Sequence, residues 1–180
     1  MFVWYAFFTV RKVREGDTMH ADFRFMDKNK AEEVLPILFD LLYANMSKIV
    51  PTENSYEEDK TFWFSCVAPA LQREKRQIVL MYVDDVLAGY FQYYISDKTF
   101  VVEELQIKPV YQRTRLLYYF YKFMQSIVPK DTMFIEAYAQ KPNKNSQSVI
   151  RSLGMECVGE NKTGLAWHYK GDCQKLFERF

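Results

Sequence analysis

The stretch from residue 100 to residue 128 constrains the fold of this chain most, because it predicts a β-strand that runs almost directly into an α-helix. Pro109 ends the strand, whose β-forming residues are Val101, Val102, Leu105 and Ile107. Apolar residues then recur at helical spacing: Leu116, Leu117, Phe120, Phe123, Met124 and Ile127. Only residues 108–114 lie between the two elements, so the connection must be a tight turn.

Such a turn is an expected anion site. The first backbone N–H groups of a helix have no partner within the helix, and here they point back over the end of the strand. Gln112, Arg113 and Arg115 add hydrogen-bond donors and positive charge at this position. The sequence therefore predicts either a phosphate-binding turn or an ordinary strand–helix unit whose turn is basic.

The rest of the chain predicts a mixed α+β fold, with a mostly antiparallel sheet and helices on both faces. Further strands are expected at residues 20–26, 77–83, 86–96, 133–139, 155–160 and 165–169, with a hairpin turn at Asp84-Asp85. Further helices are expected from Asp27 or Asn29 to about Asn45, over 61–71, and from Asn143 to Leu153, where Gly154 ends the last one. Residues 47–60 are expected to be irregular, Pro69 to shorten the second helix, and the tail from Asp172 to form a helical turn or two. Gly89 predicts a bulge or a close backbone approach.

Composition excludes several classes of function. The chain has 24 basic and 23 acidic residues and a formal net charge of +1, which favours neither nucleic acid nor an anionic membrane as partner. No apolar run reaches the length of about 20 residues that a membrane span needs. Cys66, Cys157 and Cys173 lack metal-ligand spacing and the chain has only two histidines, so we expect no metal site and no disulfide framework. A reducing cytoplasm is the expected setting.

Residues 1–19 are expected to be an N-terminal extension, and residues 20–180 the domain proper. Met1–Val10 is apolar and aromatic, but it lacks the basic region and the small-residue cleavage site of a signal peptide. It is interpreted as an extra strand, or as an arm that packs on this or another subunit. The last alternative would make the protein a homodimer.

The strand-to-helix segment resembles the acetyl-CoA-binding core of the GNAT superfamily of N-acyltransferases. That family carries an apolar residue, a proline two positions later, and then Gln/Arg-x-x-Gly-x-Gly/Ala at the start of a long helix. Ile107, Pro109 and Gln112 match this pattern. Arg115 and Leu117 stand at the two small-residue positions. If these two residues keep helical backbone angles, the amides still point at a phosphate, whereas a need for positive φ would restrict the turn.

A second landmark of the family, an Asn followed eleven residues later by Gly, is matched by Asn143 and Gly154, and Ser146 stands where a small residue is usual. The alternative is that Asn143 is only a helix N-cap and Gly154 only a C-cap. The resemblance implies a GNAT-like fold over roughly residues 20–170 and acetyl-CoA as cosubstrate. The contacts that it implies for acetyl-CoA are Leu105, Gln106, Ile107, Gln112, Arg113, Thr114, Arg115, Leu116, Leu117, Asn143 and Ser146.

The resemblance also implies an oxyanion donor and a base. A backbone N–H on the strand end at Leu105–Ile107 is expected to stabilise the oxyanion. Glu104 is expected to take a proton from the amine. Glu103 and Glu104 point to opposite faces of a regular strand, so only one of them can face the site unless a bulge intervenes. The alternative is that both are edge or surface carboxylates.

The usual acid of the family is missing. Many members carry a tyrosine seven residues after the Asn, where it protonates the departing thiolate, but this chain has Ile150 there. Tyr138, near the end of the preceding strand, is the expected substitute, and the other candidates are Tyr111, Tyr118 and Tyr119.

The expected function is direct transfer of an acetyl group from acetyl-CoA to a primary amine of an unidentified small molecule or peptide. The alternative is a degenerate GNAT fold that binds CoA or a partner protein without turnover, because Arg115, Leu117 and Ile150 depart from the family's pattern. The loop between the first two helices borders the acceptor cleft in the family. Its acidic residues here, Glu53, Glu57, Glu58 and Asp59, either attract a cationic amine or form a solvated surface.

Overall fold

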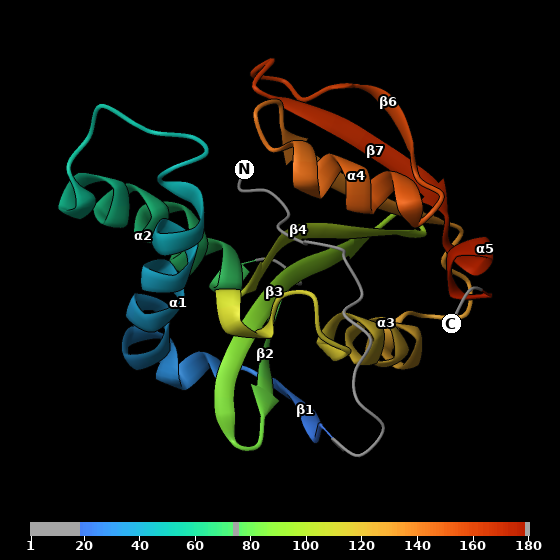
Figure 1. The fold of residues 1–180 in the computed structure, drawn as a ribbon, viewed down its shortest axis with the longest axis horizontal. Coiled ribbons are helices and arrows are strands. Elements are labelled where there is room, and N and C mark those ends of the chain that lie inside the picture. The colour runs from blue at the N-terminus through green and yellow to red at the C-terminus, as the bar shows by residue number, and fades with distance from the viewer. Residues whose placement is uncertain (1–18, 74–75, 179–180) are drawn as a thin grey trace.

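A seven-stranded sheet forms the centre of the part of the chain that the computed structural model describes, residues 19–73 and 76–178 (Figure 1). In spatial order the strands are β1 (Ala21–Phe25), β2 (Gln77–Val83), β3 (Val86–Ser96), β4 (Thr99–Ile107), β5 (Phe134–Gln140), β7 (Ala166–Asp172) and β6 (Glu156–Glu160). β4 and β5 pair in parallel, and the other described neighbours pair antiparallel. The predicted mixed, mostly antiparallel sheet is confirmed. Residues 1–18 of the predicted extension lie outside the described residues.

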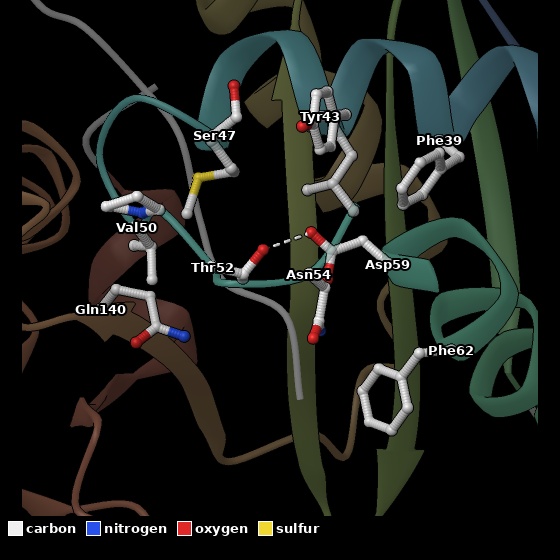
Figure 2. A pocket seen from close by; sticks show the side chains of 12 residues that line it. Phe39, Tyr43, Ser47, Val50, Thr52, Asn54, Asp59, Phe62 and Gln140 are labelled. Atoms are coloured by element: carbon white, nitrogen blue, oxygen red, sulfur yellow. Dashed lines mark hydrogen bonds between the residues drawn. The ribbon is translucent and has the colours of Figure 1, made fainter. Parts of the chain in front are cut away.

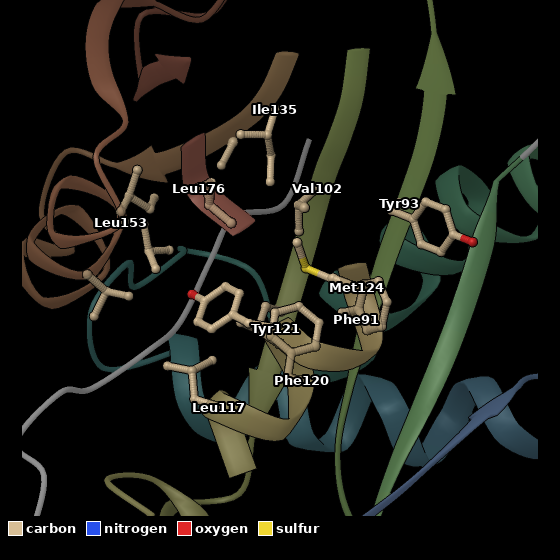
Figure 3. Packing of buried hydrophobic residues seen from close by; sticks show 14 of the residues in the cluster. Phe91, Tyr93, Val102, Leu117, Phe120, Tyr121, Met124, Ile135, Leu153 and Leu176 are labelled. Atoms are coloured by element: carbon tan, nitrogen blue, oxygen red, sulfur yellow. The ribbon is translucent and has the colours of Figure 1, made fainter. Parts of the chain in front are cut away.

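Helices cover both faces of the sheet and make three layers (Figure 1). The helices α1 (Ala31–Met46) and α2 (Tyr56–Arg73) pack on one face, and α3 (Leu116–Ile127), α4 (Lys144–Ser152) and α5 (Cys173–Phe177) pack on the other. The core accordingly has two parts. Trp63 and Tyr90 are fully buried on the α1/α2 side, while Phe120, Tyr121 and Met124 of α3 pack against the opposite face (Figure 3).

Two tight turns fix the register of β2, β3 and β4. Asp84 and Asp85 have φ angles of 49° and 62°, and Asp97 and Lys98 have φ angles of 46° and 59°. Two-residue turns with both central residues in the left-handed region match the twist of the strands that they join, and aspartate tolerates this region better than most residues. The predicted hairpin at Asp84-Asp85 is therefore confirmed, and β3 turns into β4 in the same way.

The second helix is longer than the sequence analysis predicted. It begins at Tyr56, within the segment expected to be irregular, because Ser55 and Glu58 cap it reciprocally. The Ser55 N–H donates to Glu58 Oε2 at 2.7 Å, and the Glu58 N–H donates to Ser55 Oγ at 3.3 Å. The helix also continues through Pro69 to Arg73, since Val67 and Leu71 on either side of the proline are buried against α1 and the sheet. The loss of one backbone hydrogen bond did not outweigh that burial.

Both features predicted at Gly89, a bulge and a close approach of two backbones, are present. The pairing of β2 with β3 shifts beside it, from Met81↔Gly89 to Tyr82↔Leu87. A Cβ atom at position 89 would lie 2.3 Å from the carbonyl oxygen of Gln106 in β4. Only glycine lets the β3 backbone approach the end of β4 so closely.

Candidate functional site

β4 and β5 separate partway along β4. Their parallel pairing runs from Thr99↔Phe134 to Val102↔Ala137, whereas β4 stays paired to β3 as far as Ile107. Over Leu105–Ile107, the β4 edge on the β5 side has no strand partner among the described residues. A strand edge of this kind offers N–H and C=O groups to an extended ligand.

On this edge, the side chains of the predicted acetyl-CoA contacts Leu105, Gln106 and Ile107 all pack within the protein. Leu105 and Ile107 are buried in the core under α3, so a ligand in the gap meets their backbone only. Gln106 points to the other face, where its Oε1 accepts a hydrogen bond from Asn45 Nδ2 at 3.0 Å. Asn45, in the last turn of α1, also donates to the Ile107 carbonyl at 3.1 Å and so ties α1 to the end of β4.

Gln112 braces the turn that leads from β4 into α3. Its Nε2 donates to the same Ile107 carbonyl at 2.8 Å, across a 3-10 turn formed by Pro109–Tyr111. The side chain that matches the first position of the predicted motif therefore holds the turn against the strand end. The backbone N–H of Gln112 donates to the Pro109 carbonyl at 3.3 Å, so a contact of Gln112 with a phosphate would use the second N–H of its Nε2.

The backbone of this turn shows that neither substituted glycine position requires a left-handed residue. Arg115 is the N-cap of α3 with φ −70° and ψ −5°, and the Leu117 side chain packs into the core (Figure 3). The left-handed residue is Arg113, with a φ of 61°. Thr114 Oγ1 accepts from the Leu116 N–H at 3.2 Å. The first turn of α3 is therefore helical and follows directly after the end of β4. The side chains of Arg113 and Arg115 are exposed beside it.

Asn143 is the N-cap of α4. Its Oδ1 accepts from the Ser146 N–H at 3.1 Å, and both side chains are buried. Ile150, at the position of the family's tyrosine, is fully buried in the core. The capping role of Asn143 is confirmed, and its contact with acetyl-CoA stays a prediction.

A bulge in β4 brings Glu103 and Glu104 to the same face of the sheet. Gln92 pairs with Glu104 and Tyr93 with Val102, which leaves Glu103 as the extra residue. Gln92 Nε2 donates to Glu103 at 2.9 Å, and the Tyr90 hydroxyl donates to Glu104. Tyr90 and Gln92 are two residues apart in β3 and share a face, so both carboxylates lie on the α1/α2 side. The regular alternation that would separate them does not hold here.

The two carboxylates differ in their surroundings. Glu103 pairs with Arg76, whose Nη2 lies 2.9 Å from Glu103 Oε1. Glu104 is 1% exposed. Burial raises the pKa of Glu104 from its ordinary 4.5 to about 7, and the hydrogen bond from Tyr90 offsets part of that rise. Glu104 is therefore a carboxyl group that can exchange a proton near neutral pH, and neither residue is the surface carboxylate of the alternative interpretation.

Tyr138 lies on β5 and stacks on His168 of β7, with ring centroids 4.5 Å apart and planes 12° from parallel. Burial raises the pKa of Tyr138, and the charge of Glu136 adds to the rise, so the phenol is protonated at neutral pH. Burial alone would raise the pKa of Glu136, but its contacts with Lys170 at 2.9 Å and His168 at 3.0 Å hold that pKa below its ordinary value. Among the other tyrosines considered, Tyr111 lies in the turn before α3, and Tyr118 and Tyr119 lie in its first turn.

A pocket of about 310 Å³ lies between the α1–α2 loop and the end of β5 (Figure 2). It is lined by Phe39, Leu42, Tyr43, Met46, Ser47, Val50, Pro51, Thr52, Asn54, Asp59, Phe62 and Gln140. Sequence reasoning named only Asp59 of this set. The acidic residues of the α1–α2 loop were a usable signal for this site, but nothing in the sequence places Gln140 of β5 against that loop.

Residues 19–73 and 76–178 contain neither a metal-ligand cluster nor a membrane-spanning helix. No group of three or more His, Cys, Asp or Glu side chains there could hold a metal ion. None of the helices in this part of the chain is long and apolar enough to cross a membrane.

The same arrangement of strands and helices occurs in acetyltransferases of known structure, although no family's sequence pattern and no curated protein matches the chain. The PaiA N-acetyltransferase of Thermoplasma acidophilum, solved with coenzyme A, matches over 86% of this chain and 99% of that chain, with a TM-score of 0.62 and 15% identity. FdhC, a nucleotide-linked sugar GNAT, matches over 88% and 90%, with a TM-score of 0.61 and 11% identity. The chain has the GNAT fold.

The spermidine/spermine N-acetyltransferase SpeG of Vibrio cholerae shares this GNAT fold, with a TM-score of 0.57 and 12% identity over 88% of this chain and 97% of that chain. At such identities the similarity concerns the fold alone. The predicted GNAT fold is thereby confirmed. The predicted contacts with acetyl-CoA and the catalytic roles of Glu104 and Tyr138 stay predictions.

Proposed function

We propose that this protein transfers an acetyl group from acetyl-CoA to a primary amine. The observation that carries the proposal is the gap between β4 and β5, which opens directly beside a helix N-terminus. An extended pantetheine arm fits a strand edge without a partner, and a pyrophosphate fits the N-terminus of α3. The acetyltransferases that share the fold support the same assignment.

In this proposal the Gln112–Leu117 turn binds the pyrophosphate. The N–H groups of the first turn of α3 other than that of Leu116, which Thr114 holds, donate to it, and the guanidinium groups of Arg113 and Arg115 add charge from exposed positions. Thr114 completes the turn, while Gln112 holds it against the Ile107 carbonyl. Asn143 and Ser146 lie at the start of α4, where the pantetheine arm would pass.

Bound acetyl-CoA supplies the acetyl thioester. A backbone N–H on the Leu105–Ile107 edge polarises its carbonyl, the amine nitrogen attacks the carbonyl carbon, and the C–S bond breaks. Glu104 accepts the proton that the amine loses, through water, since its carboxyl is buried and its pKa lies near neutral pH. The thiolate takes a proton from Tyr138, whose phenol is protonated at that pH.

Calorimetric titration with acetyl-CoA tests the binding site, without any amine. Arg115→Glu should weaken binding at least about tenfold, because it places a negative charge at the pyrophosphate. Lys130→Glu is the matched control, since Lys130 is an exposed cation in the loop after α3, and it should leave binding unchanged. Absence of heat and of a thermal shift at millimolar acetyl-CoA would refute the proposal.

Turnover is tested by release of free CoA thiol with a panel of primary amines. The specificity constant kcat/KM should rise through about pH 7 as Glu104 ionises. Glu104→Gln should lower kcat about a hundredfold. Ile150, fully buried where the family carries its acid, favours a second candidate, a GNAT fold that binds CoA without turnover. Binding of acetyl-CoA without release of thiol for any amine would favour that second function.

A further inference from the structure

The pocket between the α1–α2 loop and β5 adjoins the gap between β4 and β5. Gln140, the last residue of β5, forms one wall. Met46, at the end of α1, forms another, next to Asn45, which is hydrogen-bonded to the end of β4. These two walls place the pocket on the side of the molecule where β4 and β5 separate.

The walls of this pocket are mostly apolar and aromatic. Phe39 and Tyr43 of α1 have ring centroids 5.9 Å apart, and Phe62 of α2 is 61% exposed at the pocket although its side chain is large and apolar (Figure 2). A volume of about 310 Å³ is near the lower end for small-molecule sites. The pocket suits a compact apolar body rather than a folded partner.

Of the lining residues, all in the described part of the chain, only Asp59 carries a charge. Its Oδ2 accepts from Thr52 Oγ1 at 2.6 Å and its Oδ1 from Asn54 Nδ2 at 3.0 Å (Figure 2). A carboxylate can accept about four hydrogen bonds, so capacity remains for an ammonium group. The other acidic residues of the loop, Glu53, Glu57 and Glu58, do not line the pocket, and Glu58 caps α2.

We propose that the acceptor is a primary amine with one positive charge on a compact apolar body, such as an arylalkylamine or a short alkylamine. This inference rests on the proposed function and names its acceptor class. Asp59 attracts the single ammonium as it enters, before the amine loses its proton to Glu104, and the aromatic rings of Tyr43 and Phe62 favour both the cation and the apolar body. A polyamine is disfavoured, because its further charges would meet apolar walls without a partner.

The test measures amine binding by calorimetry without acetyl-CoA, so that its result is independent of turnover. The probes are 2-phenylethylamine, its uncharged isostere 2-phenylethanol, and spermidine. Asp59→Asn should weaken 2-phenylethylamine about fivefold and leave 2-phenylethanol unchanged. Glu57→Gln, which removes an exposed carboxylate of the same helix, should change neither. Spermidine should bind the unmodified protein roughly tenfold more weakly than 2-phenylethylamine, because it lacks a ring to bury.

Asp59 also holds the loop, so Thr52→Val serves as a second variant. It removes one hydrogen bond to Asp59 but no charge, and it should keep the affinity for 2-phenylethylamine within about twofold. The inference is overturned if Thr52→Val weakens the amine as much as Asp59→Asn, if Asp59→Asn has no effect, or if spermidine binds as tightly as 2-phenylethylamine. Failure of acetyl-CoA to bind would refute the proposed function instead, and the two failures are distinguishable.

Discussion

Replacing Glu104 with glutamine should change how the stability of the protein depends on pH. The carboxyl group is buried and its pKa in the folded protein is about 7, against an ordinary 4.5. The folded state therefore binds this proton more tightly than the unfolded state does. The stabilising contribution is fully present below about pH 4.5 and is lost as the pH rises through 7.

The size of this effect follows from the pKa difference. One pKa unit corresponds to about 1.4 kcal/mol, so ionised Glu104 lowers the free energy of unfolding by about 3 kcal/mol above pH 7. About 2.5 kcal/mol of that loss should develop between pH 5 and pH 8. Glutamine keeps an acceptor for the Tyr90 hydroxyl and cannot ionise, so Glu104→Gln should flatten the profile by this amount.

Urea denaturation of the wild type and of Glu104→Gln at several pH values between 5 and 8 measures the two profiles. Glu103→Gln is the matched control, because it lies on the same face and leaves Glu104 in place, and it should keep most of the pH dependence of the wild type. The glutamine amide can add a constant cost, so the slope and not the offset is the readout. Parallel profiles for the wild type and Glu104→Gln would refute the argument that burial raises the pKa of Glu104.

Substitutions at three further positions test the local backbone geometry by urea denaturation. Gly89→Ala should lower the free energy of unfolding by more than about 2 kcal/mol, because the new Cβ would lie 2.3 Å from the Gln106 carbonyl oxygen; a smaller loss would show that the strands can separate freely. Lys98→Gly should raise it by up to about 1 kcal/mol, because Lys98 has a φ of 59°, and any loss contradicts this. Asn143→Ala should lower it by about 1 kcal/mol because Asn143 is the N-cap of α4, and Asn143→Ser, which keeps an uncharged acceptor, should lose less; equal losses would argue against capping.

Local patterns predicted most of the elements. The bounds of β2 and β3 agree with the prediction because β-forming residues fill both strands and a two-residue turn joins them. The start of α2 at Tyr56 is also a local feature, because Ser55 and Glu58 form a capping pair three residues apart. The sequence analysis interpreted this acidic run as part of a loop. The continuation through Pro69 was not local, since it depends on what Val67 and Leu71 pack against.

By itself, the sequence determined the strand that turns into α3, the order of the elements, and the absence of glycine at positions 115 and 117. These features depend on residues that are neighbours along the chain. Only the tertiary structure decided that Glu103 bulges out of β4, because a bulge is defined by the register with β3. It also decided the raised pKa of Glu104 and the pocket in which Asp59 and Gln140 meet. Burial and cavities are produced by segments that are distant in the sequence, and no local pattern specifies how such segments pack.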